Sequence, residues 1–141
     1  MSVEQNIASM RRGFEEVWNK GNLSVIPEVI SPQYVAYSSA TGELGRGLAY
    51  YEQGVKSQRT AFPDLHYTVD SVVGQGDTLA IRLTLTGTMK GKMGNNEPTG
   101  KSFALKMMLF NKYVDGRCVE ATNYYDSASL FKQLGLPNPN A

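Results

Sequence analysis

The sequence predicts an α+β fold in which a curved, mostly antiparallel sheet wraps over three helices of the N-terminal half, with a short C-terminal helix. Two observations lead to this prediction. Up to Pro63, apolar residues recur at helical spacing, whereas beyond it they alternate as in half-buried strands. The 141 residues are enough for one domain with a sizeable core and too few for two.

The first helix has a predicted start and a predicted end. Ser2 can cap its N-terminus, and Gln5, three residues later, completes a capping-box pattern. Gly21 can adopt the left-handed conformation in which helices commonly end. One apolar face, which we expect to lie in the core, is formed by Ile7, Met10, Phe14, Val17 and Trp18.

A short helix, a strand and a longer helix are predicted next. The short helix ends at Pro32, and its apolar face consists of Leu23, Ile26, Val29 and Ile30. Residues 34–38 are expected to form a brief strand. The longer helix begins near Gly47 and is broken by Pro63, and its inner stripe consists of Leu48, Tyr51, Val55 and Phe62.

Four strands are predicted after Pro63, and we expect them to run antiparallel. They cover residues 65–73, 79–86, 103–113 and 119–125, with a turn at Asp115-Gly116 between the last two. Asp126 caps a last short helix, Gly135 ends it, and residues 136–141 are expected to be a flexible tail. A sheet that curls over three helices leaves a hollow where a ligand can bind.

Composition and charge argue against several classes of function. A net charge of +1 with scattered lysines and arginines gives no reason to expect nucleic acid or a membrane as partner. No stretch reaches the apolar length of a membrane-spanning helix, and the N-terminus is expected to be an amphipathic helix and not a signal peptide. Cys118 is the only cysteine, so no internal disulfide can form and a cytoplasmic protein is expected. His66, the only histidine, is expected to be exposed, so neither a metal cluster nor a Ser-His-Asp triad is predicted.

Five groups of residues, spread over nearly the whole chain, support a family resemblance. They are Val17–Leu23 (VWNKGNL), Ala61–Leu65 (AFPDL), Gly76-Asp77 with Arg82 and Gly87-Thr88, Pro98–Lys101 (PTGK), and Asp115-Gly116 with Glu120, Asp126 and Gln133–Gly135. In order and spacing these groups resemble the SnoaL-like polyketide cyclases of the nuclear transport factor 2-like superfamily. The resemblance implies one SnoaL-like domain over residues 1–135, folded as a cone-shaped barrel, with no cofactor. It also implies a homodimer that pairs through the outer face of the sheet.

The resemblance also implies a chemistry, intramolecular aldol condensation. In that reaction a carboxylate of the last strand removes a proton α to a carbonyl. The family's aspartate lies three residues before the aspartate that opens the last helix, and here Asn123 stands three residues before Asp126. An amide does not take up a proton usefully at neutral pH, although it donates and accepts hydrogen bonds. Three further family positions, which carry His, Trp and an Asp-His pair in many relatives, are occupied here by Met89, Thr122 and Ala36-Tyr37.

Two charged residues join Asn123 as catalytic candidates. Glu120 is the nearest carboxylate on the same strand, but strand alternation puts it on the face opposite to Asn123. It is therefore either a structural residue or a base. Arg82 is expected either to pair with Glu120 from a nearby strand, to lie on an exposed face of the sheet, or to bind a substrate carboxylate or enolate oxygen.

The predicted ligand site is the hollow under the sheet, with a mostly apolar wall. Its expected binding residues are Trp18, Tyr37, Met89, Met107, Leu109 and Tyr125. Such a wall favours a small hydrophobic carbonyl compound as ligand. Three hypotheses stay open: a cofactor-free cyclase or isomerase, a non-catalytic small-molecule binding protein, and a dimeric interaction module whose pocket is filled by side chains.

Overall fold

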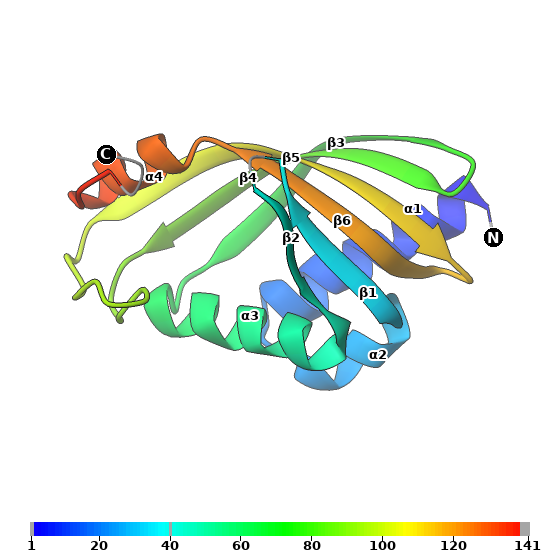
Figure 1. Cartoon of the computed structure of the whole chain (residues 1–141), viewed down its shortest axis with the longest axis horizontal. Helices are drawn as coiled ribbons and strands as arrows, with labels where there is room; N and C mark the ends of the chain where they lie inside the picture. The colour runs from blue at the N-terminus through cyan, green and yellow to red at the C-terminus, as the bar shows by residue number, and fades with distance from the viewer. Residues whose placement is uncertain (1, 40, 139–141) are drawn as a thin grey trace.

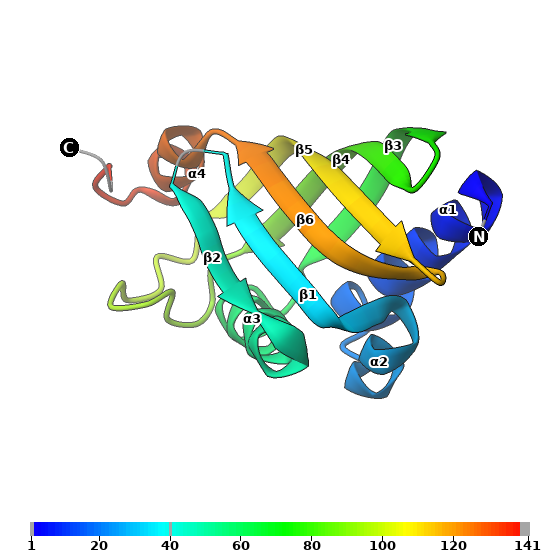
Figure 2. The same ribbon diagram turned by 45° about the vertical axis from the view of Figure 1, so that its right-hand side comes forward.

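The computed structural model describes residues 2–39 and 41–138. Within these ranges six strands form one curved sheet in the order β2-β1-β6-β5-β4-β3 (Figures 1 and 2). The strands are β1 (Ile30–Ser38), β2 (Gly42–Arg46), β3 (His66–Gln75), β4 (Thr78–Thr88), β5 (Ser102–Val114) and β6 (Arg117–Tyr125). The α+β class and the cone shape are confirmed. The sheet does not close into a barrel, because β2 and β3 remain as unpaired edges.

Helices cover the concave side of this sheet, as Figure 1 shows. They are α1 (Val3–Arg12), the π-helical segment η1 (Gly13–Trp18), the 3₁₀ turn η2 (Leu23–Val25), α2 (Ile26–Val29) and α3 (Gly47–Ala61). The C-terminal helix α4 (Ser127–Leu134) instead lies at one end of the sheet and packs against β5. No helix in the described ranges is long and apolar enough to cross a membrane.

The first helix begins as predicted and continues in a form that was not predicted. Ser2 and Gln5 form the capping box. After Arg12 the helix widens into a π-helix, in which the Asn19 N–H donates to the Phe14 carbonyl at 2.8 Å, five residues back. Gly21 then has a φ of 75°, as the predicted helix end requires. Phe14 and Val17 of the predicted apolar face are buried in this segment.

Two expectations for the next segment are wrong. The second helix covers only Ile26–Val29, and Ile30 already belongs to β1. Pro32 also lies in β1, at a break in the register between Ile30 and Val35 where a missing N–H breaks no ladder hydrogen bond. The edge strand β2 was not predicted, because its five residues are almost all exposed and show no alternation.

The four predicted antiparallel strands are confirmed as β3 to β6, and β1 joins them in parallel next to β6. The turn between β5 and β6 has positive φ at Asp115 and Gly116. The last helix is capped as predicted, since the Ser129 N–H donates to Asp126 Oδ1 at 3.1 Å. Gly135 ends it in the left-handed conformation. The expected tail lies in the described range only as far as Asn138.

The core lies between the concave face of the sheet and the helices. Phe14, Val17 and Phe62 of the predicted helix faces are buried there, as is Leu83 of β4. Trp18 and Leu48, also on those faces, and Leu130 of α4 are half-buried and pack against the core. Strand β5 alternates strictly between buried and exposed residues over its 13 positions. This strand therefore gives the sheet one inner face and one outer face along its whole length.

Candidate functional site

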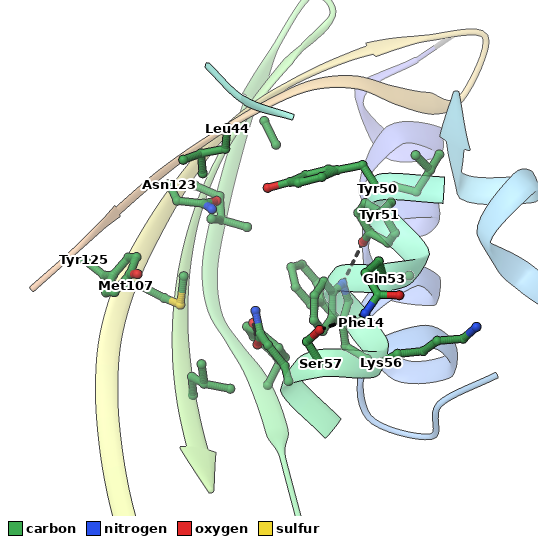
Figure 3. A pocket seen from close by; sticks show the side chains of 18 of the residues that line it. Phe14, Leu44, Tyr50, Tyr51, Gln53, Lys56, Ser57, Met107, Asn123 and Tyr125 are labelled. Carbon is green, nitrogen blue, oxygen red and sulfur yellow. Dashed lines mark hydrogen bonds between the residues drawn. The ribbon is translucent and has the colours of Figure 1, made fainter. Parts of the chain in front are cut away.

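A cavity of about 660 Å³ lies between the inner face of the sheet and the helices. That volume is in the range of sites that enclose a drug-sized molecule. Figure 3 shows its two walls, with β5 and β6 on one side and α3 and the first helix on the other. The cavity is therefore formed by the curvature of the sheet itself.

Inward-facing residues of β5 and β6 form the sheet wall. Three ladder pairs follow one another along it: Met107 with Tyr125, Leu109 with Asn123, and Asn111 with Ala121. Exposure falls along this wall, from 48% at Tyr125 to 6% at Asn111 and Ala121. The end near Tyr125 is therefore the mouth of the cavity, and the end near Asn111 is its deep end.

Aromatic side chains form most of the helix wall. Phe14 and Trp18 come from η1, and Tyr51 comes from α3. The Trp18 Nε1–H donates to the Tyr51 hydroxyl at 2.6 Å, which fixes the two rings edge to face. The Tyr67 ring of β3 lies 5.0 Å from Phe14 and 5.4 Å from Trp18 between ring centroids. The wall is rigid because each ring is held by another.

Arg59 of α3 fixes the end of η1. Its Nη1 donates to the carbonyls of Trp18 and Asn19 at 2.8 and 3.1 Å. The Asn19 side chain in turn accepts from the Tyr67 N–H at 2.7 Å and donates to the Tyr67 carbonyl at 3.0 Å. These bonds satisfy backbone groups that the helix end leaves without partners. They join η1, α3 and β3 into one frame behind the cavity.

Burial keeps the phenols and the thiol of the cavity protonated. Removal from water raises the pKa of Tyr34, Tyr51, Tyr67 and Tyr113. It also raises the pKa of Cys118 to about 12. At neutral pH these groups are therefore hydrogen-bonding groups and not bases or nucleophiles.

The cavity wall offers few other ionisable groups. Among the lining residues within the described ranges, none is Asp, Glu or His. The two lining lysines are already paired, Lys56 with Glu52 at 3.3 Å and Lys92 with Glu97 at 3.1 Å. Lys56 points away from the cavity in Figure 3. In the described ranges no cluster of His, Cys, Asp and Glu can hold a metal ion.

Tyr50 extends from α3 across the mouth toward Leu44 and Asn123 (Figure 3). Its ring packs directly on Gly45 of β2, where even a Cβ atom would lie 2.3 Å from two ring carbons. Tyr50 and Leu44 are 38% and 47% exposed, so both contact solvent as well as the cavity. The unpredicted strand β2 thus supports one side of the mouth.

Comparisons with known proteins agree with this architecture. The family profile described as SnoaL-like polyketide cyclase matches residues 8–134. The chain belongs to the SnoaL-like polyketide cyclase family. The curated relative aklanonic acid methyl ester cyclase AcmA of Streptomyces galilaeus is 25% identical over 138 residues, which cover 97% of this chain and 95% of the relative.

Several solved structures superpose over nearly the whole chain. AclR, a proposed hydroxylase from Streptomyces galilaeus, is 29% identical with a TM-score of 0.82, and the match covers 95% of this chain and 83% of AclR. IdmH, a proposed polyketide cyclase from Streptomyces antibioticus, is 27% identical with a TM-score of 0.80 over 94% of this chain and 99% of IdmH. A SnoaL-like protein from Jannaschia has a TM-score of 0.86 at 21% identity, over 97% of each chain, and supports the fold alone.

Five of the predicted site residues of this SnoaL-like protein lie together in the cavity wall. Asn123, Tyr125, Met107 and Leu109 come from the sheet, and Trp18 comes from η1. Asn123 is the polar member of the group and lies beside Leu109 on the neighbouring strand. Their positions are compatible with ligand binding, and their roles stay predictions.

Arg82 and Glu120 lie outside the cavity lining. Arg82 is exposed on the outer face of β4, and its register partners are Ser71 and Met108. Glu120 is half-buried in β6, between Val35 of β1 and Lys112 of β5 in the register. Because β5 separates β4 from β6, the expected pairing of Arg82 with Glu120 is wrong.

Tyr37 and Met89 also lie outside the lining. Tyr37 of β1 pairs in register with Glu43 and Thr122, which puts it on the side of β1 opposite to Tyr34. Met89 is fully buried after β4, where its N–H donates to the Lys101 carbonyl and its carbonyl accepts from the Gly100 N–H, both at 2.9 Å. It packs the loop between β4 and β5.

The inner face of β6 differs from strict alternation at one point. Ala121, Asn123 and Tyr125 alternate into the cavity wall, but a register shift opposite Lys112 and Tyr113 places Cys118 there in place of Val119. Sequence reasoning also missed Asn111, Tyr50 and Gln53 as lining residues. For Asn111 a signal exists, since it continues the inward series of Leu105, Met107 and Leu109.

Proposed function

We propose that this protein is a cofactor-free, cyclase-type protein whose cavity binds an uncharged, largely apolar polyketide-derived carbonyl compound. Asn123 hydrogen-bonds a carbonyl oxygen of that compound and does not remove a proton from it. The observation that carries the proposal is the position of the Asn123 amide in the cavity wall, opposite Leu109 and close to Met107 and Tyr125. Support for the reaction class comes from the SnoaL-like family and from AcmA.

The wall favours a neutral ligand. Thioether, aliphatic and aromatic groups gain about 25 cal/mol for each Å² of apolar ligand surface that they remove from water. A buried ligand charge costs several kcal/mol unless an opposite charge lies close to it. Arg82, a candidate for binding a substrate carboxylate, is exposed on the outer face of the sheet. Lys56 and Lys92 are paired with glutamates.

The Asn123 amide can assist ring closure without acting as a base. A methylene between two carbonyls enolises readily, and an N–H donor on the oxygen stabilises the negative charge that develops there. The enol carbon then bonds to a second carbonyl carbon, whose oxygen gains the proton that the enol loses. The reaction is an isomerisation, so its electron balance requires neither an oxidant nor a reductant. The cavity contributes by holding the ligand in a folded conformation.

A non-catalytic binding protein is the second candidate. It is favoured by the lack of any carboxylate or imidazole among the described lining residues. In that case the same cavity and the same amide would hold a carbonyl compound without changing it. The two candidates differ in one measurable quantity, the rate of ring closure with protein over the rate without it.

We extend the proposal to assembly as a homodimer through the outer face of the sheet. Large apolar side chains are exposed there: Val73, Met108, Phe110 and Tyr124 are 66%, 47%, 52% and 50% exposed. Met108 pairs in register with Tyr124, and Phe110 and Val73 both neighbour Ala80. A contiguous apolar face of this kind is typical of an interface. A cytoplasmic location stays a prediction.

Substitutions at Asn123 test the proposed chemistry. With aklanonic acid methyl ester as substrate and chromatographic detection of the ring-closed product, the natural protein should be slow. The Asn123→Asp variant should be faster by about tenfold or more, because a carboxylate in an apolar cavity is a general base. Asn123→Leu should bring the rate close to that of the reaction without protein.

Glu120→Gln is the matched control, because it changes a polar residue of the same strand outside the cavity lining. It should leave the rate unchanged. A natural protein that cyclises this substrate rapidly and gains nothing from Asn123→Asp would contradict the assigned role of Asn123. Binding without any acceleration by the natural protein would favour the non-catalytic candidate.

A further inference from the structure

Two of the described residues that line the cavity carry buried oxygen atoms without a hydrogen-bond partner in the protein. Within the described ranges, Asn111 Oδ1 and Ser9 Oγ are both buried without a hydrogen-bond partner, and both residues line the cavity. Asn111 belongs to the sheet wall and Ser9 to the helix wall. Asn6 Oδ1 shares this property but belongs to a residue outside the lining. Buried polar atoms without partners are rare in proteins, so two in one cavity need an explanation.

Asn111 is held in place by its own surroundings. It is 6% exposed and lies in the middle of the sheet, between Leu79 of β4 and Ala121 of β6. Its side chain lies next to the Tyr113 hydroxyl, the next inward-facing group of β5, and lowers the pKa of that phenol against the larger, opposite effect of burial. The Asn111 Oδ1 has no hydrogen-bond partner in the described part of the protein and is left for another donor.

Asn111 and Asn123 form a pair of amides on one wall. In the β5–β6 ladder, Asn111 lies opposite Ala121 and Asn123 lies opposite Leu109, so the two are diagonal neighbours. Diagonal neighbours in an antiparallel ladder are about 7–8 Å apart. Ala121 and Leu109, the other two corners of this square, are apolar. A planar ligand lying along this wall therefore meets two polar contacts along one edge.

We propose that Asn111 is a second polar anchor of the cavity and that it binds a hydroxyl group on the same edge of the ligand as the carbonyl held by Asn123. This inference rests on the proposed function and narrows its ligand class to hydroxylated, for example phenolic, ketones. A hydroxyl both donates and accepts hydrogen bonds, so it can bond to either the carbonyl oxygen or the nitrogen of the Asn111 amide. Ser9 Oγ lies on the opposite wall of the same cavity.

Three related probes test the anchor: anthraquinone, 2-hydroxyanthraquinone and 2-methoxyanthraquinone. They share one apolar skeleton and two carbonyls, and only the second has a hydroxyl donor. Trp18 is the only tryptophan of the chain and lines the cavity, so quenching of its fluorescence, checked by calorimetry, reports binding. The natural protein should bind the hydroxyl compound about 3- to 10-fold more tightly than either of the others.

The variants Asn111→Leu and Asn123→Leu make the same chemical change on adjacent levels of one wall. Asn111→Leu should abolish the preference for the hydroxyl compound while anthraquinone binding stays within about twofold. Asn123→Leu should weaken the binding of all three probes together and keep the preference for the hydroxyl compound. Asn111→Leu removes the amide that lies beside the buried Tyr113 hydroxyl, so thermal unfolding must first show that the variant is folded.

Each outcome separates the inference from the function on which it rests. A preference that persists in Asn111→Leu overturns the anchor, as does equal binding of the hydroxyl and methoxy compounds by the natural protein, a result that needs no variant. If Asn123→Leu still weakens all three probes, the proposed function stands without the anchor. If the natural protein binds none of them, the neutral-ligand cavity itself is wrong, and the anchor with it.

Discussion

The two faces of β5 differ in almost every respect, although their residues alternate within one strand. The inner face is buried from Phe103 to Tyr113 and forms the wall of a cavity. The outer face carries Met108 and Phe110, which are 47% and 52% exposed, next to Lys106 and Lys112. Both faces are partly apolar, so hydrophobicity alone does not tell them apart. The comparison shows that burial and function depend on what the fold places against each face.

The largest difference between the faces is expected in stability. Leu83 of β4 points inward and is 1% exposed, whereas its neighbour Arg82 is exposed on the outer face. Leu83→Ala removes a packed side chain and leaves a cavity, which should lower the free energy of unfolding by about 2–5 kcal/mol. Arg82→Ala should change it by less than about 0.5 kcal/mol.

Urea unfolding of both variants at one protein concentration measures this contrast. A loss below about 1 kcal/mol for Leu83→Ala would mean that the inner face has been assigned to the wrong side of the sheet. A large loss for Arg82→Ala would give the outer face a structural role that its exposure does not indicate.

The outer face should instead matter for assembly. In an isologous dimer the same surface is present on both copies, so Phe110→Lys would bury two lysines at one interface. The dissociation constant of the dimer should rise at least about tenfold, which corresponds to about 1.4 kcal/mol. Sedimentation velocity at micromolar concentration measures it. Ala8→Lys adds the same charge on the exposed side of α1 and should leave the dimer intact. A natural protein that sediments as a monomer would refute this assembly.

The sequence was most informative where one element satisfies one local rule. The capping box at Ser2, the turn at Asp115-Gly116 and the alternation of β5 each follow from a few neighbouring residues, and each is confirmed. Family resemblance then supplied the curvature that turns these elements into a cone. The position of Asn123 in the cavity wall follows from the same alternation.

The features that the sequence did not predict depend on contacts between distant segments. The last carbonyl of the π-helix η1, that of Trp18, accepts a hydrogen bond from Arg59, which lies 41 residues further along the chain. The β6 register shift that brings Cys118 inward is fixed by β5. Strand β2 is exposed and has no hydrophobic period. Arg82 and Glu120 were expected as possible partners because the residue pattern of a single strand does not reveal the order of strands in the sheet.

The smallest expected effect concerns the mouth of the cavity, where the inner face meets solvent. Gly45→Ala would place a Cβ atom 2.3 Å from the Tyr50 ring, so the ring must move away from β2. Tyr50 extends across the mouth toward Asn123, and its displacement should change access to the cavity (Figure 3). We expect the dissociation rate of 2-hydroxyanthraquinone to rise about two- to fivefold, with a smaller change in the association rate, because affinity differences among variants lie mostly in dissociation.

Gly54→Ala is the matched control for this variant. It makes the same substitution in α3, where an added Cβ meets nothing within 4 Å, and should stabilise the helix by about 0.5–1 kcal/mol without changing ligand exchange. Stopped-flow measurement of Trp18 fluorescence gives both rates. Tyr50→Ala should reproduce and exceed the effect of Gly45→Ala, since it removes the ring that the glycine accommodates. Equal dissociation rates in the natural protein and in both Gly45→Ala and Tyr50→Ala would show that ligands pass by another route, beyond the reach of the Tyr50 ring.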